Sequence, residues 1–208
     1  MRNESGMSLH CVRGGRKYLN GSERRRFVAA AAERPRDVEL FCLMLAWTGA
    51  RISEALRVTA AAFDLDRDVV ALVTLKRRRK VIREVVLPPD LLKALAERYR
   101  LRDAWSEPGK VSEPLWPWCR QTGWRYIKAV MAQAGIAGAC AMPKGLRHGF
   151  AVAALQAGVP PHLAQRWLGH ASMRMMAIYA DVSGPEEYHF AERMWRLEPA
   201  SSGSTAPK

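Results

Sequence analysis

Between residues 69 and 87 the sequence changes from a helical pattern to a strand-like one. Two runs rich in Val and Leu, VVALVTL and VIREVVLP, stand on either side of the basic run KRRRK. Apolar runs of this kind around a short polar segment predict a two-stranded hairpin with a basic tip. Because the other periodic segments are helical, we expect a single domain that is mainly α with a small antiparallel β-sheet, an α+β fold.

The helical segments around the hairpin have recognisable boundaries. Ser22 is a candidate cap for a helix that reaches about Glu33, and Pro35 opens the segment DVELFCLMLAWTG, which ends at Gly49. This second segment is apolar nearly all round, so it should lie in the centre of the core. Further helices are expected at RISEALRV, at DLLKALAERYRLRDA after Pro88 and Pro89, near 120–134 up to Gly135, at 144–157 up to Gly158, at 161–168 and at 172–180 with Ser172 as cap.

Both ends of the chain differ from its middle. Residues 1–20 are polar and without periodicity, which favours a flexible leader, and the end from residue 198, with the run PASSGSTAPK, is expected to be disordered. The segment EEYHFAERMW at 186–195 is amphipathic. The chain has 208 residues and 49% hydrophobic content, which is enough for one compact domain at 21–197.

The charge balance is the first indication of a partner. Lys and Arg total 33 against 20 acidic residues, which gives a net charge of +13 and an isoelectric point near 10.2. Basic side chains near phosphates release condensed counterions, so this balance favours a nucleic-acid partner over an inert basic surface.

The cysteines and the N-terminus argue against other classes of protein. Cys11, Cys42, Cys119 and Cys140 form no C-x-x-C pair, so neither a disulfide framework nor a zinc site is indicated. The N-terminus has no apolar signal core, and no apolar run approaches the roughly 20 residues of a membrane span. We therefore expect a soluble, cytoplasmic protein without a membrane partner.

A tyrosine that breaks a phosphodiester needs a particular set of neighbours. A phenol has an unperturbed pKa of about 10, so cations must favour its ionised form. Two arginines can each present a planar fork of donors to the charged phosphate. A lysine or histidine can protonate the leaving 5′ oxygen. Because fixed cations can stabilise the transition state, no metal and no other cofactor is required.

The chain contains such residues in short motifs. They are Arg51 in TGARISEAL, Lys76 in TLKRRRK, Arg147 in PKGLRHGFA, His170 at the end of WLGH and Tyr179 in MMAIYAD. In order and spacing the set resembles the catalytic domain of the tyrosine recombinases, the phage integrase family, over about residues 22–196. Tyr179 follows His170 by nine residues, and His170 follows Arg147 by 23. Any one motif alone would be a weak signal.

The resemblance implies a site-specific DNA recombinase or integrase. Such an enzyme cuts and rejoins DNA through a 3′-phosphotyrosyl intermediate, and Tyr179 would be its nucleophile. The bond energy stays in the phosphotyrosine, so neither ATP nor a metal is needed. The alternatives are a non-catalytic DNA-binding protein derived from the fold and a type IB-like topoisomerase.

The same resemblance implies roles at the phosphate for five basic residues: Arg51 and Arg147 as a clamp, Lys144 and His170 as assisting groups, and Lys76 as general acid. The acid could instead be Lys80, because six of the eight residues from 76 to 83 are basic. Lys76 is preferred since it closes the first strand as the family lysine does. Lys144 stands where the family pattern H-x-L-R has histidine, so it can stabilise charge but cannot easily act as a base near pH 7.

These residue types also have ordinary structural interpretations. A lone Arg in a basic protein is usually a solvated charge, a charged hairpin tip is commonly only a turn, and a Tyr beside apolar neighbours is usually in the core. His170 could bond the carbonyls at a helix end. The motifs favour function for these residues, whereas we interpret His148 as a structural hydrogen-bonding group. The remaining histidines are interpreted as surface residues: His10, His162 and His189.

The resemblance also predicts partners. Most family members place a helical core-binding domain before the catalytic domain, whereas only about 21 residues precede the first expected helix here. We therefore expect a catalytic domain on its own, with double-stranded DNA as its substrate. It would work as a homo-oligomer on DNA, joined through 186–195, or with a helper recombinase that supplies the second contact.

Overall fold

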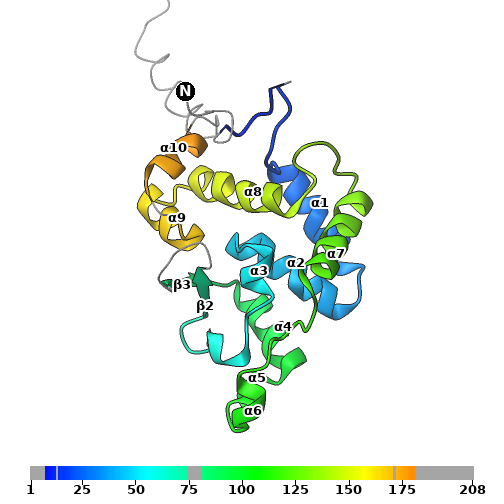
Figure 1. Cartoon of the computed structure of the whole chain (residues 1–208), viewed down its shortest axis with the longest axis vertical. Coiled ribbons are helices and arrows are strands. Elements are labelled where there is room, and N and C mark those ends of the chain that lie inside the picture. The colour runs from blue at the N-terminus through cyan, green and yellow to red at the C-terminus, as the bar shows by residue number, and fades with distance from the viewer. Residues whose placement is uncertain (1–7, 13, 75–80, 171, 181–208) are drawn as a thin grey trace, which may run out of the picture.

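The computed structural model describes residues 8–12, 14–74, 81–170 and 172–180. Helices make up most of this part of the chain, and none of them is long and apolar enough to cross a membrane (Figure 1). The elements in order are α1 (Gly21–Ala32), α2 (Arg36–Thr48), α3 (Ile52–Ala55), the 3-10 turn η2 (Ala60–Ala62), β1 (Phe63–Asp64), β2 (Val69–Thr74), β3 (Val81–Val86), α4 (Pro89–Tyr99), α5 (Leu101–Ala104), α6 (Pro108–Val111), α7 (Arg120–Gln133), α8 (Pro143–Gln156), α9 (Pro161–Leu168) and α10 (Arg174–Ala180). The predicted fold class is confirmed.

The sheet has three antiparallel strands in the order β1-β2-β3. β2 and β3 form the predicted hairpin, with Val69 opposite Val86 at its open end. β1 is an addition to the prediction, because a strand of two residues is too short to show alternation in the sequence. The basic tip at 75–80, which contains both candidate lysines, lies outside the described residues.

α2 is central to the core, as its apolar pattern predicts. Eight of its thirteen residues are buried, and it contacts α1, α4 and α8. It is followed, as predicted, by Gly49, whose φ of 60° lies in the left-handed region. A Cβ at this position would lie 2.5 Å from the Phe150 ring of α8. Glycine is therefore required here both by the backbone and by the close approach of α8.

α1 begins earlier than predicted, because Asn20 and not Ser22 is its cap. The Asn20 side chain accepts a hydrogen bond from the Glu23 amide, and the Glu23 carboxylate accepts one from the Asn20 amide, both at 2.8 Å. This reciprocal arrangement satisfies two amides at the helix start. The Ser22 hydroxyl instead bonds the Asn20 side chain at 2.9 Å.

Two further helix boundaries differ from the prediction. The helix expected from 90 to 104 is divided, because Arg100 adopts a φ of 48° between α4 and α5. This left-handed residue interrupts the helical hydrogen bonds, and neither Gly nor Pro marks the position in the sequence. α10 begins at Arg174, two residues after Ser172.

The second half of the predicted flexible leader packs against the domain. Leu9, Tyr18 and Leu19 are buried, and the Leu19 amide donates a hydrogen bond to the Gly145 carbonyl at 3.2 Å. A Cβ at Gly149 of α8 would lie 2.6 Å from the Leu19 carbonyl oxygen. The leader prediction is therefore wrong for 8–12 and 14–20, where a mostly polar sequence still contributes a few buried apolar side chains. Residues 1–7 and the segments 186–195 and 198–208 lie outside the described residues.

α8, α9 and α10 gather around a second apolar cluster, in one corner of the molecule (Figure 1). Phe150 and Leu168 belong to this cluster and also lie closest to the Gly49 Cβ position, so α2 ends against it. The sheet reaches the same corner, because α9 contacts β3. The motifs around Arg51, Arg147, His170 and Tyr179 are thereby brought together.

Candidate active site

Arg147 connects the ends of two helices. It projects from α8, is 7% exposed, and donates hydrogen bonds from Nη1 to the Gly49 carbonyl at 2.6 Å and from Nη2 to the Leu168 carbonyl at 2.5 Å. These carbonyls belong to the C-terminal ends of α2 and α9, where backbone dipoles favour a cation. Burial, and to a lesser extent the charge of Arg51, lowers the pKa of Arg147 to about 9, so the guanidinium is still charged at pH 7.

Glu54 joins Arg51 to Arg83 in a network of ion pairs. Its Oε1 accepts a hydrogen bond from Arg51 at 2.7 Å, and its Oε2 accepts one from Arg83 at 2.6 Å. Arg83 also donates to the Thr74 hydroxyl at 2.8 Å and to the Trp167 carbonyl at 2.7 Å. Burial raises the pKa of Glu54, but the hydrogen bond and charge of Arg83 outweigh burial, so the pKa lies below its ordinary value. An ionised carboxylate thus links α3 to β3 and, through Arg83, to α9.

Sequence reasoning missed Glu54 and Arg83 as members of this site. Glu54 lies inside TGARISEAL, three residues after Arg51, where N3 glutamates commonly close a helix start. Arg83 lies on the buried face of β3, two residues before the buried Val85. A charge at an inward-facing strand position requires a partner, and this alternation was the available signal.

The Tyr179 side chain is buried between two histidines. Its oxygen lies 2.7 Å from His148 Nδ1, and its ring stacks on that of His170 with centroids 6.1 Å apart and planes at 9°. The residue is 2% exposed. Burial raises the pKa of Tyr179 to about 12, and the opposing charges of Arg147 and Arg51 do not cancel this effect. The phenol is therefore protonated at neutral pH.

Both imidazoles beside Tyr179 are neutral at pH 7. Burial lowers the pKa of His170 to about 3, with a further contribution from Arg147. Burial also lowers the pKa of His148 to about 4, with a further contribution from Lys144. A neutral imidazole carries one nitrogen that can accept a proton, so each ring is able to act as an acceptor.

The structure brings together four of the six predicted residues: Arg51, Arg147, His170 and Tyr179. The charges of Arg51 and Arg147 act on the other two residues, since each of them lowers the pKa of Tyr179 and of His170. Lys144 is exposed in the first turn of α8, one turn before His148. Lys76, like its alternative Lys80, lies outside the described residues.

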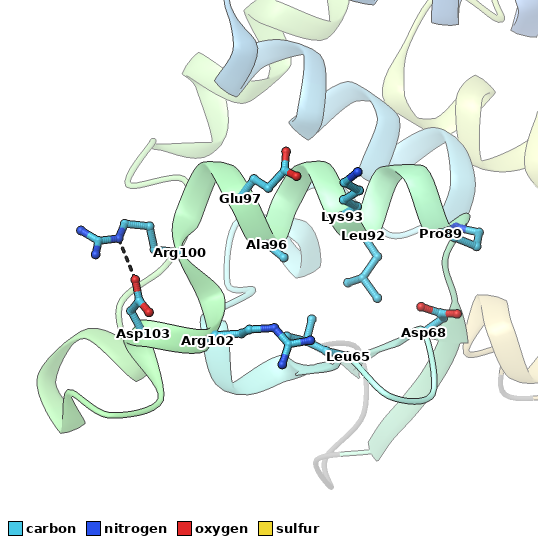
Figure 2. A pocket seen from close by; sticks show the side chains of 10 residues that line it. All are labelled: Leu65, Asp68, Pro89, Leu92, Lys93, Ala96, Glu97, Arg100, Arg102 and Asp103. Carbon is cyan, nitrogen blue, oxygen red and sulfur yellow. Dashed lines mark hydrogen bonds and ion pairs between the residues drawn. The ribbon is translucent and has the colours of Figure 1, made fainter.

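A separate hollow lies away from this corner, where α4 and α5 meet the turn before β2. Its volume is about 510 Å³, and Lys93 and the ion pair of Arg100 with Asp103 lie on its border (Figure 2). None of the predicted site residues lines it. The candidate chemistry therefore belongs to the corner around α8 and not to this hollow.

Comparison with known proteins points to one family. The Phage integrase family matches residues 17–185. Tyrosine recombinase XerD from Brucella abortus biovar 1 (strain 9-941) is 32% identical over 166 residues, which are 74% of this chain and 52% of that protein. The chain thus spans about half the length of the relatives it matches.

Solved structures share the fold. XerH site-specific recombinase bound to palindromic difH substrate, in a post-cleavage complex, superposes with a TM-score of 0.70 at 22% identity, over 93% of this chain and 56% of that one. The catalytic domain of bacteriophage HP1 integrase gives a TM-score of 0.62 at 22% identity, over 90% of this chain and 98% of that one. Together with the match over residues 17–185, which confirms the resemblance carried by the motifs, these findings show that the chain belongs to the phage integrase family.

Proposed function

We propose that this chain is a site-specific DNA recombinase or integrase that cuts and rejoins strands through a 3′-phosphotyrosyl intermediate. The observation that carries the proposal is the meeting of the Tyr179 phenol with Arg51, Arg147 and His170 in one corner. A tyrosine recombinase name among the relatives and a post-cleavage DNA complex among the structural neighbours support it.

The chemistry follows from these groups. The Tyr179 oxygen attacks the scissile phosphorus, and Arg51 and Arg147 stabilise the negative charge that gathers on the phosphate oxygens. The bonds to the Gly49 and Leu168 carbonyls use two of the five N–H donors of Arg147, so the guanidinium can also bind a phosphate. His170 and Lys144 assist, and Lys76 protonates the leaving 5′ oxygen. A 5′-hydroxyl of a partner strand then reverses the step, without ATP or a metal.

Double-stranded DNA is the proposed substrate, and the net charge of +13 supports this partner. Strand exchange needs more than one active site on the DNA. We therefore infer either a homo-oligomer on DNA, joined through 186–195, or a helper recombinase. Because double-stranded DNA is the proposed substrate, we propose the cytoplasm as the place where the chain acts.

A non-catalytic DNA-binding protein is the second candidate. Two observations favour it: Tyr179 is 2% exposed, and Lys144 replaces the histidine of the family pattern. A protein of this kind would bind DNA through the same cations without forming a covalent link.

A nicked suicide substrate, cut from the DNA that neighbours the coding sequence, distinguishes the two candidates. We expect the wild-type chain to form a covalent protein–DNA adduct that survives denaturing electrophoresis. Tyr179→Phe should form none and should bind DNA as the wild type does, because only the nucleophilic oxygen is lost. An adduct with Tyr179→Phe would assign the nucleophile to another residue. DNA binding without any wild-type adduct would favour the second candidate.

A further inference from the structure

Position 144 leaves the proposed reaction without the base that a histidine would supply. Lys144 is exposed at the start of α8 and carries an amine in place of the imidazole of the family pattern. Residues four apart in a helix lie on the same face, so His148 follows Lys144 by one turn on the side that faces α10. An imidazole is therefore present one turn further along the same helix.

His148 touches the reacting atom directly. Its Nδ1 lies 2.7 Å from the Tyr179 oxygen, within the range of a short O–H···N hydrogen bond. The two rings lie 5.6 Å apart with planes at 48°, so the contact is through the nitrogen and not through ring stacking. A protonated phenol beside a neutral imidazole donates its hydrogen, which places the ring proton of His148 on Nε2.

We propose that His148 is the proton acceptor for Tyr179 during strand cleavage. This inference rests on the proposed function and assigns His148 a catalytic role, whereas the sequence suggested a structural hydrogen-bonding group. The Tyr179 phenol and the His148 imidazole have the geometry of a nucleophile with its general base.

The step balances without a further reactant. The bond from the Tyr179 oxygen to phosphorus forms, the bond from phosphorus to the 5′ oxygen breaks, and the phenol proton moves to His148 Nδ1. The leaving 5′ oxygen takes its proton from the general acid, Lys76 in the proposed function. When a 5′-hydroxyl attacks the phosphotyrosine, its proton returns to that acid and the His148 imidazolium returns its proton to the tyrosine oxygen.

Nearby cations set the condition under which this acceptor works. The charged and titratable groups around the pair come from the N-terminal segment, the start of α3, α8 and the end of α9: Lys17, Arg51, Lys144, Arg147 and His170. Lys144, Arg147 and Lys17 oppose a positive charge on His148. Arg147 and Arg51 favour a negative charge on Tyr179. DNA phosphates placed against the same cations would weaken their opposition to a charged His148, so proton transfer is favoured when the substrate is bound.

The test measures single-turnover adduct formation on the suicide substrate. His148→Asn places an amide oxygen near the Nδ1 position, so it keeps an acceptor for the phenol but cannot take its proton. We expect its rate to fall by about 100-fold or more, in line with the loss of a general base. His162→Asn, an exposed histidine on α9, is the matched control and should keep the wild-type rate. In His148→Ala, added imidazole should restore part of the lost rate.

A second substrate separates the two ends of the reaction. A 5′-bridging phosphorothioate has a leaving group that needs no protonation, so it corrects the loss of a general acid. The defect of His148→Asn should persist on this substrate, because it lies at the nucleophile. Full recovery would assign His148 to the leaving group and overturn the proposal.

Other outcomes also decide the question. A wild-type or faster rate in His148→Asn would show that His148 only holds Tyr179 in place. Absence of any wild-type adduct would remove the proposed function itself, and is thus distinguishable from failure of the inference. If neither His148 variant folds, ¹⁵N NMR of the wild-type imidazoles gives the answer: a protonated Nε2 with an unprotonated Nδ1 supports the proposal, and a protonated Nδ1 overturns it.

Discussion

Arg147 is a structural residue as well as a proposed phosphate ligand. Arg147→Ala would leave the Gly49 and Leu168 carbonyls without their donor, and an unsatisfied buried acceptor costs about 1–3 kcal/mol. We expect this variant to lose about 3 kcal/mol of unfolding free energy, against about 1 kcal/mol for Arg51→Ala, whose side chain is 27% exposed. Denaturant titration checks the difference, and equal stabilities would contradict it. Both variants should lose cleavage.

The two buried imidazoles make the folded chain sensitive to acid. Their folded pKa values, about 4 for His148 and about 3 for His170, lie below the unfolded value near 6.5. The unfolded state therefore binds more protons than the folded state. The stability that the two neutral imidazoles contribute is present above about pH 6.5 and is lost as pH falls towards the folded pKa values. At pH 5 the loss is about 2 kcal/mol for each imidazole.

Thermal unfolding at pH 7 and pH 5 measures this loss. We expect Tm to fall in the wild type and to fall less in His148→Asn, which removes one of the two groups. The exposed His162 provides the control, because the Tm of His162→Asn should fall as much as that of the wild type. An identical decrease in all three proteins would show that the buried imidazoles do not control the acid response.

At the scale of elements, the end of α2 positions the site. The Gly49 carbonyl holds Arg147, and a Cβ at Gly49 would lie 2.5 Å from Phe150 at a φ of 60°. Gly49→Ala should therefore cost well over the roughly 1 kcal/mol of a strained backbone alone, and should displace Arg147.

Gly135 offers a matched comparison for this substitution. It follows α7 at a φ of 64°, but a Cβ there would meet nothing within 4 Å. We expect Gly135→Ala to cost about 1 kcal/mol and to leave adduct formation unchanged. Denaturant titration and the suicide substrate measure both effects. Equal costs at the two glycines would show that α2 and α8 can separate to accept a methyl group.

At the scale of the whole molecule, the positive charge should dominate DNA affinity. Each phosphate contact releases counterions, so we expect the affinity for a DNA duplex to fall at least about tenfold between 50 and 200 mM salt. Lys144→Gln, at the site, should lower the slope of log K against log salt by about one. Lys93→Gln, on α4 beside the hollow of Figure 2, should leave the slope unchanged. A gel-shift titration with equal slopes for both variants would place the DNA elsewhere.

The sequence by itself determined the fold class, most helix boundaries and the order of the motifs. Pro35, Gly49, Gly135 and Gly158 lie where helices begin or end, because these residues restrict or permit backbone angles regardless of distant contacts. The hairpin followed from two Val- and Leu-rich runs on either side of a basic segment. Boundaries set by less specific residues, such as the break at Arg100, left no comparable signal.

Only the tertiary structure decided what the site residues touch. Arg147 meets a carbonyl 98 positions away, Arg83 meets Glu54 at a separation of 29, and His148 meets Tyr179 at a separation of 31. No local pattern encodes such contacts, because they depend on how α2, α8, α9 and α10 pack around two apolar clusters. The motifs named residues that meet at the corner, whereas burial decided their protonation and packing decided which histidine contacts Tyr179, the proposed nucleophile.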